Sequence, residues 1–255
     1  MTDNTNHLVQ RLREGQKLVG TLVTLPLPEM AEGLAKAGFD WLWVDLEHAP
    51  LSLRDLQSIL STVEGKASAL VRIPDNNLVW IKQVLDLGVE GIIVPLVNCA
   101  SEARRAVDAA KYPPEGSRSV GIARAHGHGL SFKSYVERAN TSTAVILQVE
   151  HIEGVRNIDE ILAVPGVDGI LIGPYDLSGS MNLLGQTTHP EVLAAVETVR
   201  AACERRGMPV GAFTFSPTEA RSLLARGFGF VAVGIDAHYL LSAAREALAG
   251  ARVTA

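Results

Sequence analysis

The sequence contains few cysteines, few aromatic residues and no long hydrophobic run. Of its 255 residues, two are cysteines, Cys99 and Cys203, which lie far apart and without metal-type spacing. Neither a disulfide framework nor a zinc site is therefore expected. Aromatic residues make up 5% of the chain, and its many small aliphatic residues favour helices packed on strands over a β-sandwich. The longest apolar runs are too short to span a bilayer.

A strong charge of one sign is also absent. The formal net charge is −5 and there is no basic stripe, which argues against nucleic-acid binding. Residues 1–10 are polar and lack the apolar core of a signal peptide. We therefore expect a cytoplasmic protein that binds neither nucleic acid nor membranes. No linker or low-complexity segment divides the chain, so residues 1–255 are expected to form a single domain.

Short hydrophobic runs recur along the chain and are continuous, as is typical of strands buried on both faces. The runs expected to be strands are residues 18–24, 41–46, 69–73, 91–95, 144–150, 169–172, 209–213 and 230–234. The amphipathic segments expected to be helices are residues 29–37, 53–63, 78–87, 101–111, 154–164, 190–206, 217–226 and 237–248. This alternation predicts an α/β protein with a (β/α)8 TIM barrel. A doubly wound sheet would usually show a glycine-rich loop after its first strand, and none is present.

One long connection, residues 112–143, lies between the fourth and fifth predicted strands. It contains Arg124, His126 and His128. Because long loops in compact domains tend to be functional, these side chains are candidates to contact substrate or a neighbouring subunit. A solvated loop is an equally supported alternative.

Reactive residues stand at the ends of four predicted strands. They occur in Asp45-Leu46-Glu47-His48, in Arg72, in Gln148-Val149-Glu150 and in Gly173-Pro174-Tyr175-Asp176. In a parallel barrel the carboxyl ends of the strands meet at one rim, where the chemistry takes place. Structural roles stay open for each group, namely an ion pair for the arginine and helix caps for the carboxylates.

The spacing within these groups indicates what they bind. Gln148 and Glu150 are separated by one residue and therefore face the same side of their strand. If a helix begins near Tyr175, its backbone N–H groups are free to bind an anion. Two carboxylates, Glu150 and Asp176, favour Mg²⁺ or Mn²⁺ over zinc. No lysine lies at the inward end of a predicted strand, which disfavours a Schiff-base enzyme, and no nucleotide motif predicts an organic cofactor.

At these residues the sequence resembles the class II pyruvate-dependent aldolases of the HpcH/HpaI family. The resemblance covers nearly the whole chain and is carried by residues 37–41, 45–50, 81–88, 112–114, 173–178 and 231–234. It implies a carbon–carbon lyase that reversibly cleaves 4-hydroxy-2-keto acids to pyruvate and an aldehyde. It also implies Mg²⁺, Mn²⁺ or Co²⁺ as the metal. The implied assembly is a homo-oligomer, a hexamer built as a trimer of dimers, in which the last helix packs on a neighbouring subunit.

The same resemblance implies a role for each residue. His48 is similar to the catalytic base of the family, and Asp86 to the acid that hydrogen-bonds this base. Arg72 is similar to the residue that stabilises the developing oxyanion. The remaining implied positions are the metal ligands Glu150 and Asp176 and the substrate-binding residues Asp45, Gln148, Gly173, Pro174, Tyr175 and Asp176.

The sequence departs from the family pattern at Leu46, at Tyr175 and within residues 121–130. A tyrosine at position 175 is expected to narrow the mouth of the site, so the acceptor aldehyde stays open. Two other functions also stay open. One is an acyl-CoA lyase of the citrate lyase β type, whose members tend to be longer. The other is a non-catalytic barrel that binds a small acid.

Overall fold

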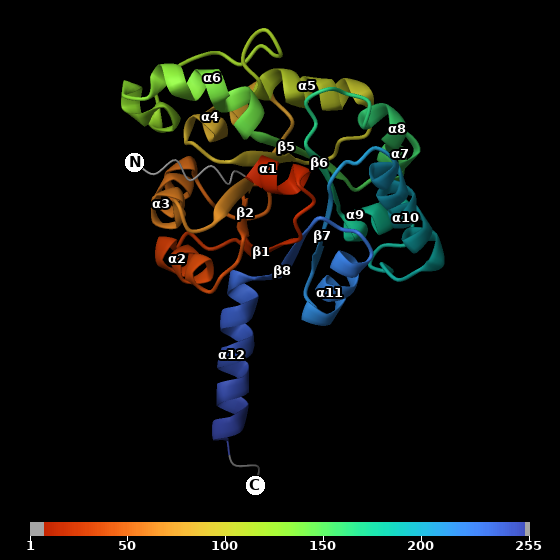
Figure 1. Ribbon diagram of the computed structural model, residues 1–255. Helices are drawn as coiled ribbons and strands as arrows, with labels where there is room; N and C mark the ends of the chain where they lie inside the picture. The colour runs from red at the N-terminus through yellow and green to blue at the C-terminus, as the bar shows by residue number, and fades with distance from the viewer. Residues whose placement is uncertain (1–7, 253–255) are drawn as a thin grey trace.

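In the computed structural model, the described residues 8–252 form a closed barrel of eight parallel strands in chain order, surrounded by helices (Figure 1). Residues 1–7 and 253–255 lie outside the described residues, and with them most of the polar N-terminal segment considered above. The strands are β1 (Leu18–Val23), β2 (Trp41–Asp45), β3 (Ser68–Arg72), β4 (Gly91–Val94), β5 (Ala144–Val149), β6 (Gly169–Ile172), β7 (Val210–Thr214) and β8 (Phe230–Ile235). The predicted (β/α)8 barrel is confirmed, and each observed strand overlaps its predicted run.

The helices follow the predicted alternation, with additional short elements. They are α1 (Leu8–Arg13), α2 (Pro28–Lys36), α3 (Leu53–Val63), α4 (Leu78–Asp86), α5 (Ala100–Ala110), the 3-10 helix η1 (Arg124–Gly129), α6 (Phe132–Ser142), α7 (Ile152–Arg156), α8 (Ile158–Ile161), α9 (Pro174–Ser180), α10 (Pro190–Arg205), α11 (Pro217–Ala225) and α12 (Asp236–Ala251). The predicted helix over residues 154–164 is wrong in detail, because the chain breaks at Asn157 into α7 and α8. In the described part of the chain no helix is long and apolar enough to cross a membrane.

Aromatic side chains fill the interior of the barrel. Trp41 on β2 packs edge-on against Phe230 on β8, with ring centroids 5.7 Å apart. Gly20 on β1 faces this pair, and a Cβ there would overlap the Trp41 ring, so the close approach requires glycine. Helix α1 buries Leu8 against the same cluster. The barrel is thus a packed core, and ligands can reach only its ends.

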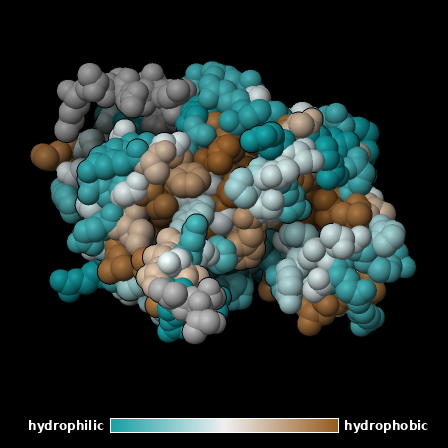
Figure 2. Space-filling view, turned by 90° about the horizontal axis from the view of Figure 1, so that it is seen from below, coloured by the Kyte–Doolittle hydropathy of each residue, from teal (hydrophilic) through white to brown (hydrophobic). Residues whose placement is uncertain are grey.

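Helix α12 does not fold back onto the barrel. It begins after β8, contacts β1 and β8 near its start, and projects away from the body (Figure 1). Among its residues only Asp236 is buried, whereas Leu240, Leu241 and Leu248 are exposed. Figure 2 views the molecule from this side and shows hydrophobic residues gathered in the middle of the face. The packing of α12 on a neighbouring subunit stays a prediction.

The long connection forms η1 and α6, and it packs on α4. His126 is fully buried there, and its Nε2 lies 3.2 Å from Tyr112 Oη. Lys111, where the connection begins, forms a 3.6 Å ion pair with Asp168, which precedes β6. The connection therefore lies near the amino ends of the strands. The solvated-loop expectation is wrong for His126, because the ring belongs to a packed cluster.

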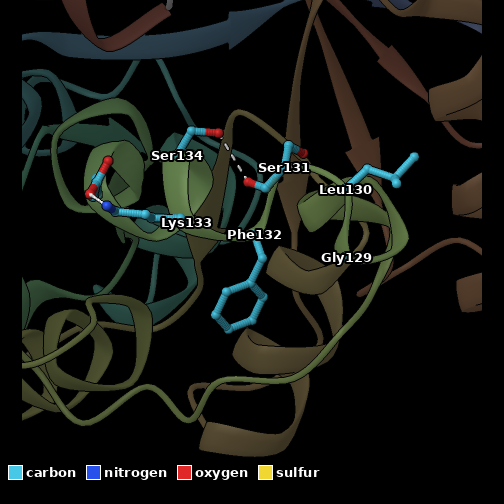
Figure 3. Close-up of a pocket in the computed structure, with 7 residues that line it drawn as sticks. Gly129, Leu130, Ser131, Phe132, Lys133 and Ser134 are labelled. Atoms are coloured by element: carbon cyan, nitrogen blue, oxygen red, sulfur yellow. Dashed lines mark hydrogen bonds and ion pairs between the residues drawn. The ribbon is translucent and has the colours of Figure 1, made fainter.

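The outer surface of this connection carries a shallow hollow (Figure 3). Its lining residues are Gly129, Leu130, Ser131, Phe132, Lys133, Ser134 and Glu137. Leu130 is 97% exposed, and Lys133 and Glu137 form only a loose ion pair of 3.9 Å on the surface. Because its polar groups lie in solvent, this hollow offers little to hold a ligand, and we do not treat it as a candidate site.

Candidate active site

The ends of β2 and β3 form the first half of the rim. The strand register places Asp45 beside Arg72. Arg72 Nε donates to Asp45 Oδ1 at 2.9 Å, and Arg72 Nη2 donates to Asp45 Oδ2 at 2.7 Å. Such a two-pronged contact fixes the plane of the guanidinium. Arg72 Nη1 also lies 3.1 Å from Glu47 Oε2, so the predicted ion pair is present and Asp45 is its second member.

Arg72 is almost completely buried, at 7% exposure, and its guanidinium lies 4.9 Å from the centre of the Trp43 ring. Burial acts to lower the pKa of Arg72, but the hydrogen bonds and charge of Asp45 outweigh it and the pKa is raised. The side chain therefore presents a permanent, immobile positive charge at the rim. Both oxygens of Asp45 are engaged with Arg72, and its direct contact with substrate stays a prediction.

His48 stands beside this group but is far more exposed. Its side chain is 70% exposed, and Nε2 lies 3.6 Å from Glu47 Oε2. The turn that carries His48 is held by Asp45, because Asp45 Oδ1 accepts hydrogen bonds from the N–H groups of Glu47 at 3.0 Å and His48 at 3.4 Å. The histidine is thus placed at the rim by a rigid turn while its ring stays accessible to a ligand.

The end of β5 forms the second half. Gln148 and Glu150 are 2% and 4% exposed, and Gln148 Nε2 donates a very short hydrogen bond to Glu150 Oε2. This contact confirms that the two side chains share one face of the strand. Leu96 N–H donates to Glu150 Oε1 at 3.0 Å. Gly173 leaves room for the carboxylate, because a Cβ there would lie 2.9 Å from Glu150 Oε2.

Two glutamates of the rim, buried Glu150 and partly buried Glu47, lie close to other negative charges. Burial raises the pKa of Glu150, and the hydrogen bonds from Leu96 and Gln148 only partly oppose this, while the charges of Glu47 and Asp176 add to it. Burial also raises the pKa of Glu47, opposed mainly by Arg72. The carboxylates of Glu47, Glu150 and Asp176 therefore repel one another at this end of the barrel. A cation bound among them would stabilise the charged form of each.

The buried Oε1 of Gln148 has no hydrogen-bond partner among the described residues, and Glu47 Oε2, although ion-paired with Arg72, accepts no well-aligned hydrogen bond. Buried acceptors without donors are rare and call for an explanation such as a ligand or ion. No group of three or more His, Cys, Asp or Glu residues with metal-binding geometry occurs within residues 8–252. The donors present fit a hard divalent ion held by two carboxylates, with water or substrate oxygens completing the shell.

The third part of the rim is the start of α9. This helix begins at Pro174, with Asp176 in its first turn. The first N–H groups of a helix have no acceptor within it, so the anion-binding backbone predicted at Tyr175 and Asp176 has the required local structure. The ring of Tyr175 is 59% exposed and lies against Gly185, where a Cβ would be 3.5 Å from its hydroxyl.

An open groove of about 510 Å³ adjoins His48. Its lining residues are Thr24, Leu25, Pro26, His48, Ala49, Pro50, Phe215, Ile235, Ala237, His238 and Leu241. Most of these side chains are apolar. Buried Asp236 ties its walls together, since the carboxylate accepts hydrogen bonds from the N–H groups of Thr24 and Leu25, both at 2.9 Å.

Asp86 lies elsewhere. It is the last residue of α4, which runs antiparallel to β3, and its Oδ1 accepts a 2.7 Å hydrogen bond from Arg118 Nη2. Among the described residues of the single chain, no hydrogen bond or ion pair joins Asp86 to His48. Arg118 and Leu96 were not predicted from the sequence: Arg118 stands in the long connection, and Leu96 follows a strand end but has an apolar side chain and acts through its backbone N–H.

The fold and the rim define a TIM-barrel protein whose acid-rich carboxyl end combines a buried arginine, an exposed histidine and unpaired acceptors. Residues 19–243 match the model of the HpcH/HpaI aldolase/citrate lyase family, and the chain belongs to that family. It is 41% identical over 250 residues to a hydroxypyruvate/pyruvate aldolase of Pseudomonas aeruginosa, covering 96% of this chain and 92% of the relative.

Two further comparisons agree. The chain is 40% identical over 232 residues to a 2-dehydro-3,6-dideoxy-6-sulfogluconate aldolase of Pseudomonas putida, covering 90% of this chain and 91% of the relative. The crystal structure of an HpcH/HpaI aldolase/citrate lyase family protein from Burkholderia cenocepacia J2315 superposes with a TM-score of 0.93 at 36% identity, covering 96% and 99% of the two chains. The predicted family, and an enzyme of the carbon–carbon lyase class, are confirmed.

Proposed function

We propose that the chain is a divalent-metal-dependent aldolase that cleaves 4-hydroxy-2-keto acids to pyruvate, or a related 2-keto acid, and an aldehyde. The observation that carries this proposal is the pairing of unlike groups at one rim. Buried Glu150 presents a carboxylate and buried Gln148 an acceptor oxygen without a donor, while Arg72 presents a fixed positive charge. His48 stands beside them with its ring exposed. A divalent cation held by the rim carboxylates would bind the anionic carboxylate and the keto oxygen of a 2-keto acid, and Arg72 would face the negative charge that develops on the substrate.

Glu150 and Asp176 would hold the metal ion, which we expect to be Mg²⁺ or Mn²⁺, with Co²⁺ as a further candidate. A bound divalent ion withdraws charge from the keto carbonyl and makes the adjacent carbon more acidic. The amide of Gln148 and the free N–H groups at the start of α9, at Gly173-Pro174-Tyr175-Asp176, would bind the substrate. No organic cofactor is invoked.

In the cleavage direction, His48 takes the proton from the C4 hydroxyl of the substrate. The O–H electrons form the aldehyde C=O, the C3–C4 bond breaks, and its electron pair passes into the pyruvate enolate. Arg72 stabilises the enolate oxygen, because its buried charge is already in place before the reaction. Protonated His48 then gives its proton to C3, directly or through water, which yields pyruvate and restores the neutral imidazole. A histidine suits this role since its ordinary pKa lies near neutrality.

If Asp86 is the residue that hydrogen-bonds His48, it must belong to another copy of the chain. Within one chain Asp86 is bound to Arg118 at the far end of α4. We therefore propose a homo-oligomer, a hexamer by family resemblance, in which Asp86 of one copy orients His48 of the next. Within a single chain the nearest carboxylate to the His48 ring is Glu47, at 3.6 Å.

The relatives support an aldolase over the acyl-CoA lyase, because those at about 40% identity are named as aldolases of hydroxypyruvate, pyruvate and a deoxy-sulfo-sugar acid. The apolar groove beside His48 and the exposed ring of Tyr175 are where we expect the aldehyde substituent to lie. The non-catalytic barrel is disfavoured, since the proposed base and both proposed metal ligands are present. The cytoplasmic location stays a prediction.

Exchange of the C3 protons of pyruvate in D₂O, followed by NMR with Mg²⁺ or Mn²⁺ added, tests the proposal without knowledge of the aldehyde. We expect the wild type to exchange these protons and His48→Ala to lose exchange by on the order of 10²-fold or more. His189→Ala, which removes a surface helix cap on α10, is the matched control. Undiminished exchange in His48→Ala would overturn the base assignment, and trapping of a pyruvate adduct by borohydride would point to a lysine enzyme instead.

A further inference from the structure

Leu96, just after β4, has a backbone conformation that leucine rarely adopts. Its φ is +53°, in the left-handed region that disfavours residues with a Cβ. Its side chain is 56% exposed and so gains little from packing. The side chain therefore does not explain the conformation. Strained backbone of this kind tends to occur where a functional site requires it.

The backbone of this loop holds the two inward residues of β5. Leu96 N–H donates to Glu150 Oε1 at 3.0 Å, and the next N–H, of Val97, donates to the carbonyl oxygen of Gln148 at 3.1 Å. The loop is itself anchored from outside, since Asn157 Nδ2 donates to the carbonyl oxygen of Asn98 at 2.8 Å. The left-handed turn at residue 96 thus aims one N–H group inward at the carboxylate.

Three neighbouring residues fix the orientation of the Glu150 carboxylate. One oxygen accepts from Leu96 and the other from Gln148, and Gly173 packs directly against the carboxylate. A carboxylate held in this way keeps lone pairs available at a fixed orientation.

We propose that Leu96 is a positioning residue whose left-handed backbone holds Glu150 in the orientation that binds the divalent cation. This inference rests on the proposed function of Glu150 as a metal ligand. Its distinctive consequence is that the backbone conformation at position 96 matters and the leucine side chain does not.

Two pairs of variants distinguish a role of the backbone conformation at position 96 from a role of the leucine side chain. Leu96→Gly and Leu96→Asn tolerate a positive φ, whereas Leu96→Val and Leu96→Ile are β-branched and resist it. All four keep the N–H group, and the three with a side chain place it at the exposed position of Leu96. Titration with Mn²⁺ alone, followed by its EPR signal, gives the dissociation constant. We expect Val and Ile to weaken binding by on the order of 10- to 100-fold, and Gly and Asn to stay within about threefold of wild type.

Leu27→Val is the matched control. Leu27 is also an exposed leucine, at 46%, but its φ of −122° is ordinary extended backbone, so we expect an unchanged dissociation constant. Equal Mn²⁺ binding in all four Leu96 variants would overturn the inference. Weakening that follows side-chain size, with Gly the poorest binder, would also overturn it.

Amide hydrogen exchange at position 96, measured without metal, tests the clamp apart from the proposed function. We expect Glu150→Gln, which leaves a weaker acceptor, to speed exchange of this amide relative to wild type, with Glu153→Gln as the exposed control. Identical exchange in Glu150→Gln and wild type would overturn the clamp. If the wild type bound no Mn²⁺, the proposed function would fail, while this measurement would still decide whether Leu96 holds Glu150. The exchange comparison also decides the case if the β-branched variants do not fold.

Discussion

Two buried arginines of this protein have similar immediate contacts and different surroundings. Arg72 at the carboxyl end of the barrel donates to Asp45, and Arg118 in the long connection donates to Asp86, each at 2.7 Å. Each guanidinium also lies over an aromatic ring, with centroid distances of 4.9 Å and 4.5 Å. Both pairs are therefore shielded, charge-assisted contacts of the kind that fix side-chain geometry.

The difference lies in what remains unpaired around them. Near Arg72 the buried atoms without a hydrogen bond are acceptors, Gln148 Oε1 and the ion-paired Glu47 Oε2, and carboxylates outnumber the arginine. Near Arg118 they are nitrogens, Arg118 Nε and His126 Nδ1, inside a cluster of aromatic rings. A surplus of negative acceptors is completed by a cation, whereas a balanced pair among aromatic rings needs no ligand. The first site is suited to bind a cation, whereas the second holds the connection on α4 and fixes the carboxylate of Asp86.

Removal of metal should give the largest loss of activity, and it should affect the site around Arg72 but not the site around Arg118. After exhaustive EDTA treatment we expect pyruvate release from a 4-hydroxy-2-keto acid to fall to background, with recovery on adding Mn²⁺ or Mg²⁺, because the carboxylates at the rim alone cannot acidify the substrate. The measurement is the initial rate of pyruvate release from a panel of 4-hydroxy-2-keto acids that yield different aldehydes, with the residual metal content of the protein quantified. Full activity in protein shown to be metal-free would place the chemistry elsewhere.

Replacement of Arg72 should reduce catalysis more than folding. Arg72→Lys keeps the charge but loses the two-pronged contact with Asp45, and we expect kcat to drop by on the order of 10²–10³-fold, as for other groups that stabilise a developing oxyanion. Steady-state kinetics and urea unfolding on the same preparation separate the two effects. A rise in KM with kcat unchanged would assign Arg72 to substrate binding alone.

Replacement of Arg118 should lower the free energy of unfolding. Arg118→Met leaves Asp86 without its partner, and we expect a loss of about 3 kcal/mol in the free energy of unfolding, since breaking a buried pair from one side is costly. The double variant Arg118→Met/Asp86→Leu should recover part of this loss. Urea unfolding of the metal-free proteins gives the values. A loss under about 0.5 kcal/mol, as at an ordinary surface site, would remove the structural role assigned to this pair.

The smallest predicted effect is a pH dependence of the free energy of unfolding that arises from Glu150 at the rim. Because burial raises the pKa of Glu150 above its ordinary value of 4.5, the folded state binds this proton more tightly than the unfolded state. The resulting stability is fully present below pH 4.5 and is lost as the pH rises through the raised pKa. Without metal, Glu150→Gln should therefore gain stability relative to wild type above pH 4.5, by at most about 1.4 kcal/mol per pH unit.

Urea unfolding at several pH values in EDTA measures this difference, with exposed Glu153→Gln as the control. Saturating Mn²⁺ should reverse the order, since it stabilises only the protein that binds it. A wild type and a Glu150→Gln variant with parallel stability curves would show that the carboxylate is not strained by its surroundings.

Much of the fold and part of the site could be predicted from the sequence. The strands were recognisable because residues buried on both faces give continuous apolar runs. The shared face of Gln148 and Glu150 followed from the two-residue period of a strand, and their contact confirms it. The convergence of Arg72 and Asp45 followed from the geometry of a parallel barrel. These features depend on local spacing and on one rule of architecture.

Other features depend on contacts between distant segments. His126 looked like a loop residue, and only the packing of the connection buries it against Tyr112. Asp86 looked like an ordinary helix end, and only the fold brings Arg118 to it across 32 residues of chain.

The barrel, the family and the residue types at the rim could be inferred from the order of the residues, because hydrophobic periodicity and motifs are properties of that order. The oxygens left without donors, and the hydrogen bond from the N–H of Leu96 in a left-handed turn to Glu150, become visible in the folded chain alone. The physical reason is that hydrogen bonding and burial depend on the three-dimensional neighbours of an atom. Those neighbours come from strands and loops that the order of residues does not place side by side.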